Sequence, residues 1–103
     1  MPEVIRINPY TESVTRYEVN DVDNNLIQSF LNSCINTVVA VFSNFNCMLI
    51  VSSDYKNKSR CKAFVFDGVV YYSFGIVVNK DYMGDVDKNF YIKVDFIKEL
   101  ENI

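Results

Sequence analysis

The sequence predicts an α+β fold in which a predominantly antiparallel sheet of five to seven strands packs against one main helix. From Cys61 to Asn79, two β-branched and aromatic segments flank the dipeptide Asp67-Gly68, which is a strong short-range signal for a β-hairpin. A different segment, about 22–34, has apolar residues at helical spacing. Half of the 103 residues are hydrophobic, which suffices for a single domain over 1–103 with one packed core.

The first two strands are expected to form a hairpin. Val4 to Ile7 is a short apolar segment that ends at the turn-forming pair Asn8-Pro9. From Ser13 to Val19, the residues alternate between two faces, as they do in a strand. We therefore predict an antiparallel pair with its loop at Pro9 to Glu12.

The predicted helix is amphipathic, and its apolar face is expected to lie across the sheet. This face consists of Val22, Leu26, Ile27, Phe30, Leu31 and Cys34. Asn20, Asp21 and Asp23 are candidate N-caps, because their side chains can accept hydrogen bonds from the N–H groups of the first turn.

Two further apolar segments, Thr37 to Ser43 and Phe45 to Ser52, are rich in β-branched residues. Their almost continuous apolarity predicts central strands that are covered at least partly on both faces. Gly75, in the second strand of the Asp67-Gly68 hairpin, indicates a bulge or a close approach to the backbone.

The last quarter of the chain is expected to contain a loop, then a strand and then a short helix. Residues 79–89 are predicted as the loop, and residues 90–95 alternate as a strand does. Asp95 is then placed to cap a short C-terminal helix through residues 97–103.

Composition limits the class of protein. The net charge of −3, from 13 acidic and 10 basic residues, is too small for a phosphate mimic or a general nucleic-acid surface. Cys34, Cys47 and Cys61 contain no Cys-x-x-Cys pair and have apolar neighbours, which predicts buried free thiols and a reducing, cytoplasmic location. The start of the chain lacks the apolar core of a signal peptide, and polar residues interrupt the most apolar stretch, so no membrane span is expected.

Catalytic and metal-binding motifs are not recognisable. Without any histidine, the cysteines and serines lack the usual activating base, so we expect no enzyme and no cofactor. The pattern Asp-Val-Asp-x-Asn occurs at Asp21 to Asn25 and at Asp85 to Asn89. A calcium loop needs glycine at the next position, where these segments have Leu26 and Phe90. We therefore expect a helix cap and an exposed acidic turn.

Four tyrosines are the candidates for a protein-contact surface, since tyrosine is enriched where proteins meet. These are Tyr71, Tyr72, Tyr82 and Tyr91. Successive residues on a strand point to opposite faces, so one of Tyr71 and Tyr72 is expected to face the core and the other solvent.

The basic loop 56–62 is a second candidate. It contains Lys56, Lys58, Arg60 and Lys62, and Tyr55 precedes them. Such a loop can contact the phosphates and bases of single-stranded nucleic acid, or a small nucleotide. Because native sheets use lysine to prevent edge pairing, a solvated loop that blocks self-association is the favoured interpretation.

Five segments follow one another as EVIRINPYTESVTRYEV, NLIQSFLNSC, NTVVAVF, CMLIVSS and YYSFGIVVN. Over residues 3–79 this order resembles a small domain of uncharacterised function found in bacteriophage and plasmid genes. The family often has paired glycines after the helix, where this chain has residues 33–36 as Ser-Cys-Ile-Asn. The resemblance implies a small cytoplasmic accessory protein of a mobile element and supplies no catalytic residues.

The leading hypothesis is a non-enzymatic protein-binding module, in the form of a phage-encoded inhibitor of a host or defence protein. A homodimer formed through an open sheet edge is compatible with it. Two alternatives stay open: a nucleic-acid-binding module that uses the loop 56–62, and a protein that sequesters a small nucleotide.

Overall fold

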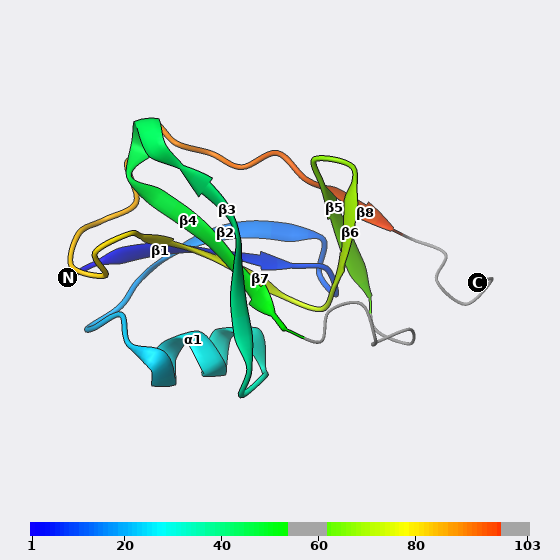
Figure 1. The fold of residues 1–103 in the computed structure, drawn as a ribbon, viewed down its shortest axis with the longest axis horizontal. Coiled ribbons are helices and arrows are strands. Elements are labelled where there is room, and N and C mark those ends of the chain that lie inside the picture. The colour runs from blue at the N-terminus through cyan, green and yellow to red at the C-terminus, as the bar shows by residue number, and fades with distance from the viewer. Residues whose placement is uncertain (54–61, 98–103) are drawn as a thin grey trace.

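The computed structural model describes residues 1–53 and 62–97. Within them, one helix and eight strands in two antiparallel sheets confirm the α+β class (Figure 1). The elements are β1 (Glu3–Asn8), β2 (Ser13–Glu18), α1 (Asn24–Leu31), β3 (Asn36–Phe42), the 3₁₀ turn η1 (Ser43–Phe45), β4 (Cys47–Ser52), β5 (Ala63–Phe66), β6 (Val69–Tyr72), β7 (Gly75–Asn79) and β8 (Asp95–Ile97). No helix in these described residues is long and apolar enough to span a membrane.

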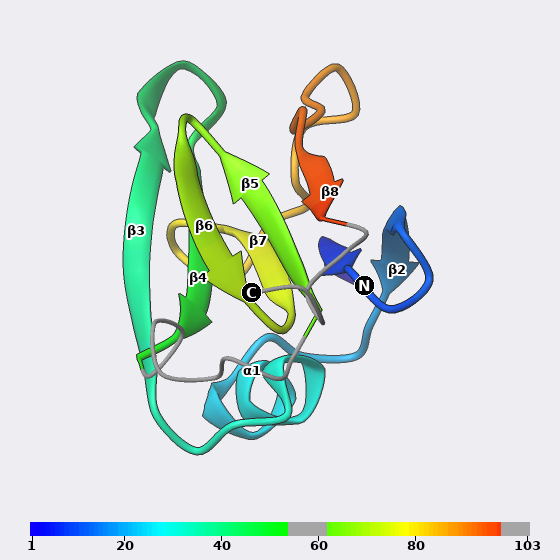
Figure 2. The same cartoon turned by 90° about the vertical axis from the view of Figure 1, so that its right-hand side faces the viewer.

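The strands are divided between a five-stranded sheet, in the order β2-β1-β7-β4-β3, and a three-stranded sheet, in the order β6-β5-β8. Helix α1 covers one face of the larger sheet, where Ile27 and Leu31 pack with Ile76. The smaller sheet and the segment 86–94 cover the other face, where Phe64 and Phe90 join the core (Figure 2). Strands β4 and β7 are therefore buried on both faces, which explains their nearly continuous apolar sequences.

Both predicted hairpins are present, but the second strand of the Asp67-Gly68 hairpin ends at Tyr72, and Gly75 belongs to a separate strand of the other sheet. Strands β1 and β2 pair antiparallel from Glu3↔Glu18 to Asn8↔Ser13. Strands β5 and β6 are joined by Asp67 and Gly68, whose φ angles of 52° and 77° are both positive, as a type I′ turn requires. The chain then leaves the smaller sheet at Ser73, where a φ of 74° turns it toward β7 in the larger sheet.

Helix α1 is shorter than the range 22–34. Asp23 is its N-cap, since its carboxylate accepts a hydrogen bond of 2.9 Å from the Leu26 N–H. The helix ends at Asn32, which has the left-handed φ of 54°. Cys34 lies beyond this end and is exposed, so the expectation of a buried thiol is wrong there.

The other two cysteines differ in what the structure describes. Cys47, on β4, is a buried free thiol, as predicted. Cys61 lies outside the described residues. Gly75 marks a close approach to the backbone, because a Cβ built there would lie 2.9 Å from Cζ of Phe64.

The C-terminal quarter differs from the predicted strand and helix. Residues 90–94 form no strand, and their alternation arises because Phe90 and Ile92 pack on the larger sheet while Tyr91 and Lys93 face solvent. Residues 95–97 form β8, which pairs with β5 instead of starting a helix. The rest of the expected C-terminal helix, 98–103, lies outside the described residues.

Strand β3 occupies an edge of the larger sheet and not the predicted central position. Its register against β4 shifts between Val38 and Ala40, so the strand carries a bulge. Val38 and Val41 are 45% and 52% exposed, whereas Val39, Ala40 and Phe42 are partly covered. Strands β3 and β4 are therefore both continuously apolar in sequence, but β4 is buried whereas β3 leaves two valines exposed at the sheet edge.

Candidate protein-contact surface

The four predicted tyrosines do not form one surface. Tyr71 faces the core, as expected for one member of its pair, and stacks on Phe64 with ring centroids 5.4 Å apart. Its neighbour Tyr72 is half-buried. Tyr82 packs with the α1 side of the larger sheet, and Tyr91 is 80% exposed on the segment that covers the opposite side.

The basic loop cannot be placed as a group. Lys56, Lys58 and Arg60 lie outside the described residues, and Lys62 is exposed just before β5. Binding of a nucleic acid or a nucleotide by this loop stays a prediction.

A different set of aromatic residues comes together around Arg6 on the α1 side of β1. The Arg6 side chain lies between two rings, with its Cζ 4.3 Å from the Phe74 centroid and 5.4 Å from the Phe30 centroid. Its Nε donates a 3.1 Å hydrogen bond to the backbone carbonyl of Phe30. Cation–π contacts and the hydrogen bond together hold the guanidinium in one place.

Two exposed tyrosines extend this group at its ends. The Tyr10 ring lies 5.3 Å from the Phe74 ring, and the Tyr17 ring meets the Phe30 ring edge-on at 5.5 Å. Tyr10 is 48% exposed and Tyr17 is 40% exposed. We call the five residues Tyr10, Phe74, Arg6, Phe30 and Tyr17 the aromatic–arginine cluster.

The Arg6 side chain is held in a fixed position by its contacts, and its two Nη atoms donate no hydrogen bond within the described residues. Within the described residues, Nε makes the only side-chain hydrogen bond of Arg6, and the one ion pair there involves a different arginine. The two Nη atoms can therefore bind a carboxylate of a partner in the bidentate manner of arginine. Arginine and tyrosine are also the residue types that dominate binding energy at protein interfaces.

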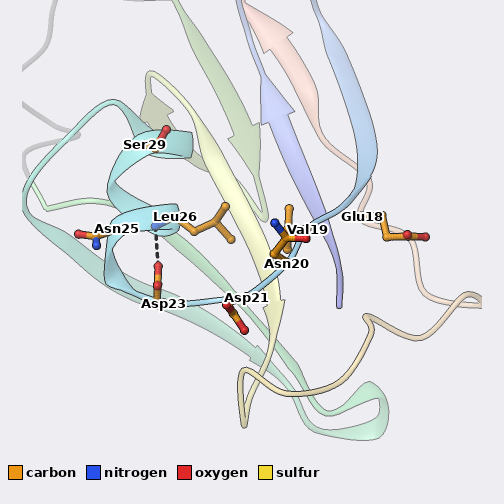
Figure 3. A pocket seen from close by; sticks show the side chains of 8 residues that line it. All are labelled: Glu18, Val19, Asn20, Asp21, Asp23, Asn25, Leu26 and Ser29. Atoms are coloured by element: carbon orange, nitrogen blue, oxygen red, sulfur yellow. Dashed lines mark hydrogen bonds between the residues drawn. The ribbon is translucent and has the colours of Figure 1, made fainter. Parts of the chain in front are cut away.

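The first Asp-Val-Asp segment lies beside a shallow hollow at the start of α1 (Figure 3). The Asp23 carboxylate is directed to the Leu26 N–H, whereas Asp21 and Glu18 point away from it. Within residues 1–53 and 62–97, no group of three or more acidic or cysteine side chains is placed to hold a metal ion. The segment thus serves as the helix cap that its sequence predicts.

The second Asp-Val-Asp segment is organised by an arginine. Arg16 donates hydrogen bonds to the backbone carbonyls of Val86 at 3.1 Å, Asp87 at 2.8 Å and Phe90. The same guanidinium forms an ion pair of 2.8 Å with Glu3. This turn is therefore fixed by its backbone oxygens against the edge strand β2.

Cys47 lies close to this turn, and its thiol is expected to be unreactive. Burial raises the pKa of its thiol to about 11; Arg16 opposes the increase and Asp87 adds to it. The thiol therefore stays protonated near neutral pH, and a protonated thiol is a poor nucleophile.

Part of the aromatic–arginine cluster was visible in the sequence. Alternation along β1 puts Arg6 on the same face as Val4, so a charged residue interrupts an apolar face that the helix was expected to cover. A second signal is the complete absence of charged residues from Asn24 to Ser53. That segment supplies α1, β3 and β4, so the charges of the chain are concentrated elsewhere.

Comparison with known proteins leaves the sequence-based resemblance as it was. No family model matches the chain, and no curated protein or solved structure is significantly similar to it. The resemblance to a small domain of bacteriophage and plasmid genes over residues 3–79 remains a prediction.

Proposed function

We propose that this chain is a non-enzymatic accessory module that binds another protein through the aromatic–arginine cluster. The observation that carries the proposal is Arg6 held between Phe30 and Phe74, with Tyr10 and Tyr17 half-exposed at either end. A surface of this composition provides large apolar area together with a directed positive charge.

The arrangement favours binding because its components are already ordered. Immobilising a flexible side chain on binding costs about 0.5–1.5 kcal/mol, and the contacts of Arg6 lower that cost. Truncating a central aromatic or arginine residue of an interface typically costs about 2 kcal/mol or more. The partner surface that fits is apolar with an acidic residue positioned to meet the Arg6 guanidinium.

Inhibition of a host or defence protein is the form of this function that the phage and plasmid resemblance implies. Occluding a partner needs contact area and no catalytic group. In this form the protein acts in the cytoplasm of the cell that carries its gene.

The proposal is tested by affinity purification of the tagged full chain from nuclease-treated lysate of its host cell, followed by mass spectrometry. Wild-type protein is compared with the double variant Tyr10→Ala/Tyr17→Ala and with the control Tyr91→Ala, which removes an exposed tyrosine outside the cluster. We expect a stoichiometric partner with wild type and Tyr91→Ala, and at least about a tenfold loss with the double variant.

Two results would overturn this assignment. Loss of the partner with Tyr91→Ala but not with the double variant would place the contact on the segment 86–94. Recovery of nucleic acid without nuclease, with binding that falls steeply as salt rises, would instead favour the loop 56–62.

A further inference from the structure

Strand β3 is an open edge with an unusual composition, and it is separate from the aromatic–arginine cluster. It pairs with β4 on one side and is the last strand of the larger sheet within the described residues (Figure 2). An edge strand presents a row of backbone N–H and C=O groups that can pair with another strand. At seven residues, β3 is long enough to form such a ladder.

The bulge arranges the exposed side chains of this edge. Val38 lies opposite Ile50 and Val41 lies opposite Met48, so both valines are on the α1 side of the sheet although three positions separate them. Helix α1 does not cover them, and both are about half-exposed. Ile35, just before the strand, is exposed as well.

The features that normally protect an edge are nearly all missing from β3. Natural edge strands carry lysine, other charges or proline, or are very short. Strand β3 contains none of these residues, and the surrounding segment from Asn24 to Ser53 has no charge at all. The bulge at Val38 and Ala40 is the one protective feature that the described strand retains.

We infer that β3 is a self-association surface whose occupant is β3 of a second copy of this chain, paired antiparallel about a two-fold axis. A two-fold contact brings each residue near the same surface of its copy, so any charge near the axis would repel its equivalent. An uncharged strand avoids this repulsion. It also offers no charge pattern with which to select a different partner.

The symmetry fits the side chains as well as the backbone. A two-fold axis perpendicular to the sheet joins the two larger sheets into one and keeps both α1 helices on the same side. Val38 and Val41 of both copies then form one apolar patch across the junction. The area of a strand pair with this patch is small for a protein interface, so a reversible dimer is expected.

Sedimentation velocity of the full chain tests the inference. At about 200 µM we expect a species of twice 11.9 kDa, which dissociates on dilution to about 1 µM, as a small interface should. Because the edge is uncharged, the dissociation constant should change less than about threefold between low and high salt.

The decisive variants are Val38→Lys on β3 and Val14→Lys on β2. Both replace an exposed valine on an edge strand of the same sheet, so they change net charge equally and leave the core intact. We expect Val38→Lys to weaken dimerisation at least about tenfold, since it buries a charge in the contact, and Val14→Lys to dimerise like wild type. Circular dichroism confirms the fold of each variant.

Three outcomes would overturn the inference: a wild-type chain that is monomeric at about 200 µM, a Val38→Lys variant that dimerises normally, or equal weakening by both lysines.

Discussion

The two edge strands of the larger sheet differ in their charge and in what lies beside them. On β2, Arg16 pairs with Glu3 and donates to the carbonyls of Val86 and Asp87, so this turn is held beside the strand. On β3, the described residues show neither a charge nor a covering segment, and Val38 and Val41 face solvent. Figure 2 shows the two strands on opposite sides of the molecule.

The difference shows that one sheet can protect its two edges by different means. On β2, the charges of Arg16 and Glu18 oppose pairing with another strand, and Arg16 also binds the carbonyls of the neighbouring turn. An uncharged strand leaves β3 to be closed by association, and without association such a strand is an aggregation site. The stability of the monomer should therefore depend on β2, and its assembly on β3.

The largest effect on stability is expected from Arg16→Met, which removes the hydrogen bonds and the ion pair but keeps the apolar stem. Bonds to a charged group contribute more than neutral ones, and we expect a loss of about 3 kcal/mol in the free energy of unfolding, measured with urea. Arg16→Lys is the matched control, because it keeps the charge but cannot reach several carbonyls at once. A loss below about 1 kcal/mol in the methionine variant would show that β2 is not held by this residue.

Cys47, which lies near the same arginine, is expected to have a smaller and pH-dependent effect on the free energy of unfolding. Its pKa is about 11 in the folded protein, so at alkaline pH the unfolded chain loses this proton first. The contribution of this thiol to the free energy of unfolding is therefore fully present below about pH 9. It falls by roughly 2–3 kcal/mol as the pH rises to about 11.

The check is the free energy of unfolding between about pH 8 and pH 11 for wild type and Cys47→Ala. The variant lacks the thiol, so its stability should fall less over this range. Parallel curves for the two proteins would mean that the thiol is not held protonated by burial.

The smallest effect is expected from Val38→Lys on the stability of the isolated monomer. Because Val38 is half-exposed, the change should stay within about 0.5 kcal/mol when measured at a concentration where wild type is monomeric. A loss of about 2 kcal/mol would show instead that Val38 belongs to the core, and the contrast with β2 would fail.

Local signals in the sequence predicted the parts of the fold that depend on neighbouring residues. The Asp67-Gly68 turn and the Asp23 cap were both predictable, since each depends on contacts a few residues apart. The division into two sheets was not, because it depends on a left-handed Ser73, a conformation that serine rarely adopts.

The candidate surfaces were less predictable because they depend on contacts between distant segments. Arg6 and Phe30 are 24 positions apart, so their contact cannot be derived from periodicity. The apolar sequences of β3 and β4 resemble each other, and only pairing distinguishes an edge from a centre. The lack of charge from Asn24 to Ser53 was the sequence signal that could have identified the edge formed by β3.

Amide hydrogen exchange of β2 and β3 at dilute and concentrated conditions tests the contrast most directly. We expect those amides of Asn36–Phe42 that do not donate to β4 to exchange at least about tenfold more slowly in the concentrated sample, while the amides of Ser13–Glu18 keep the same rate. Unchanged exchange in β3, or an equal slowing of both strands, would contradict the assignment of β3 as the edge that associates.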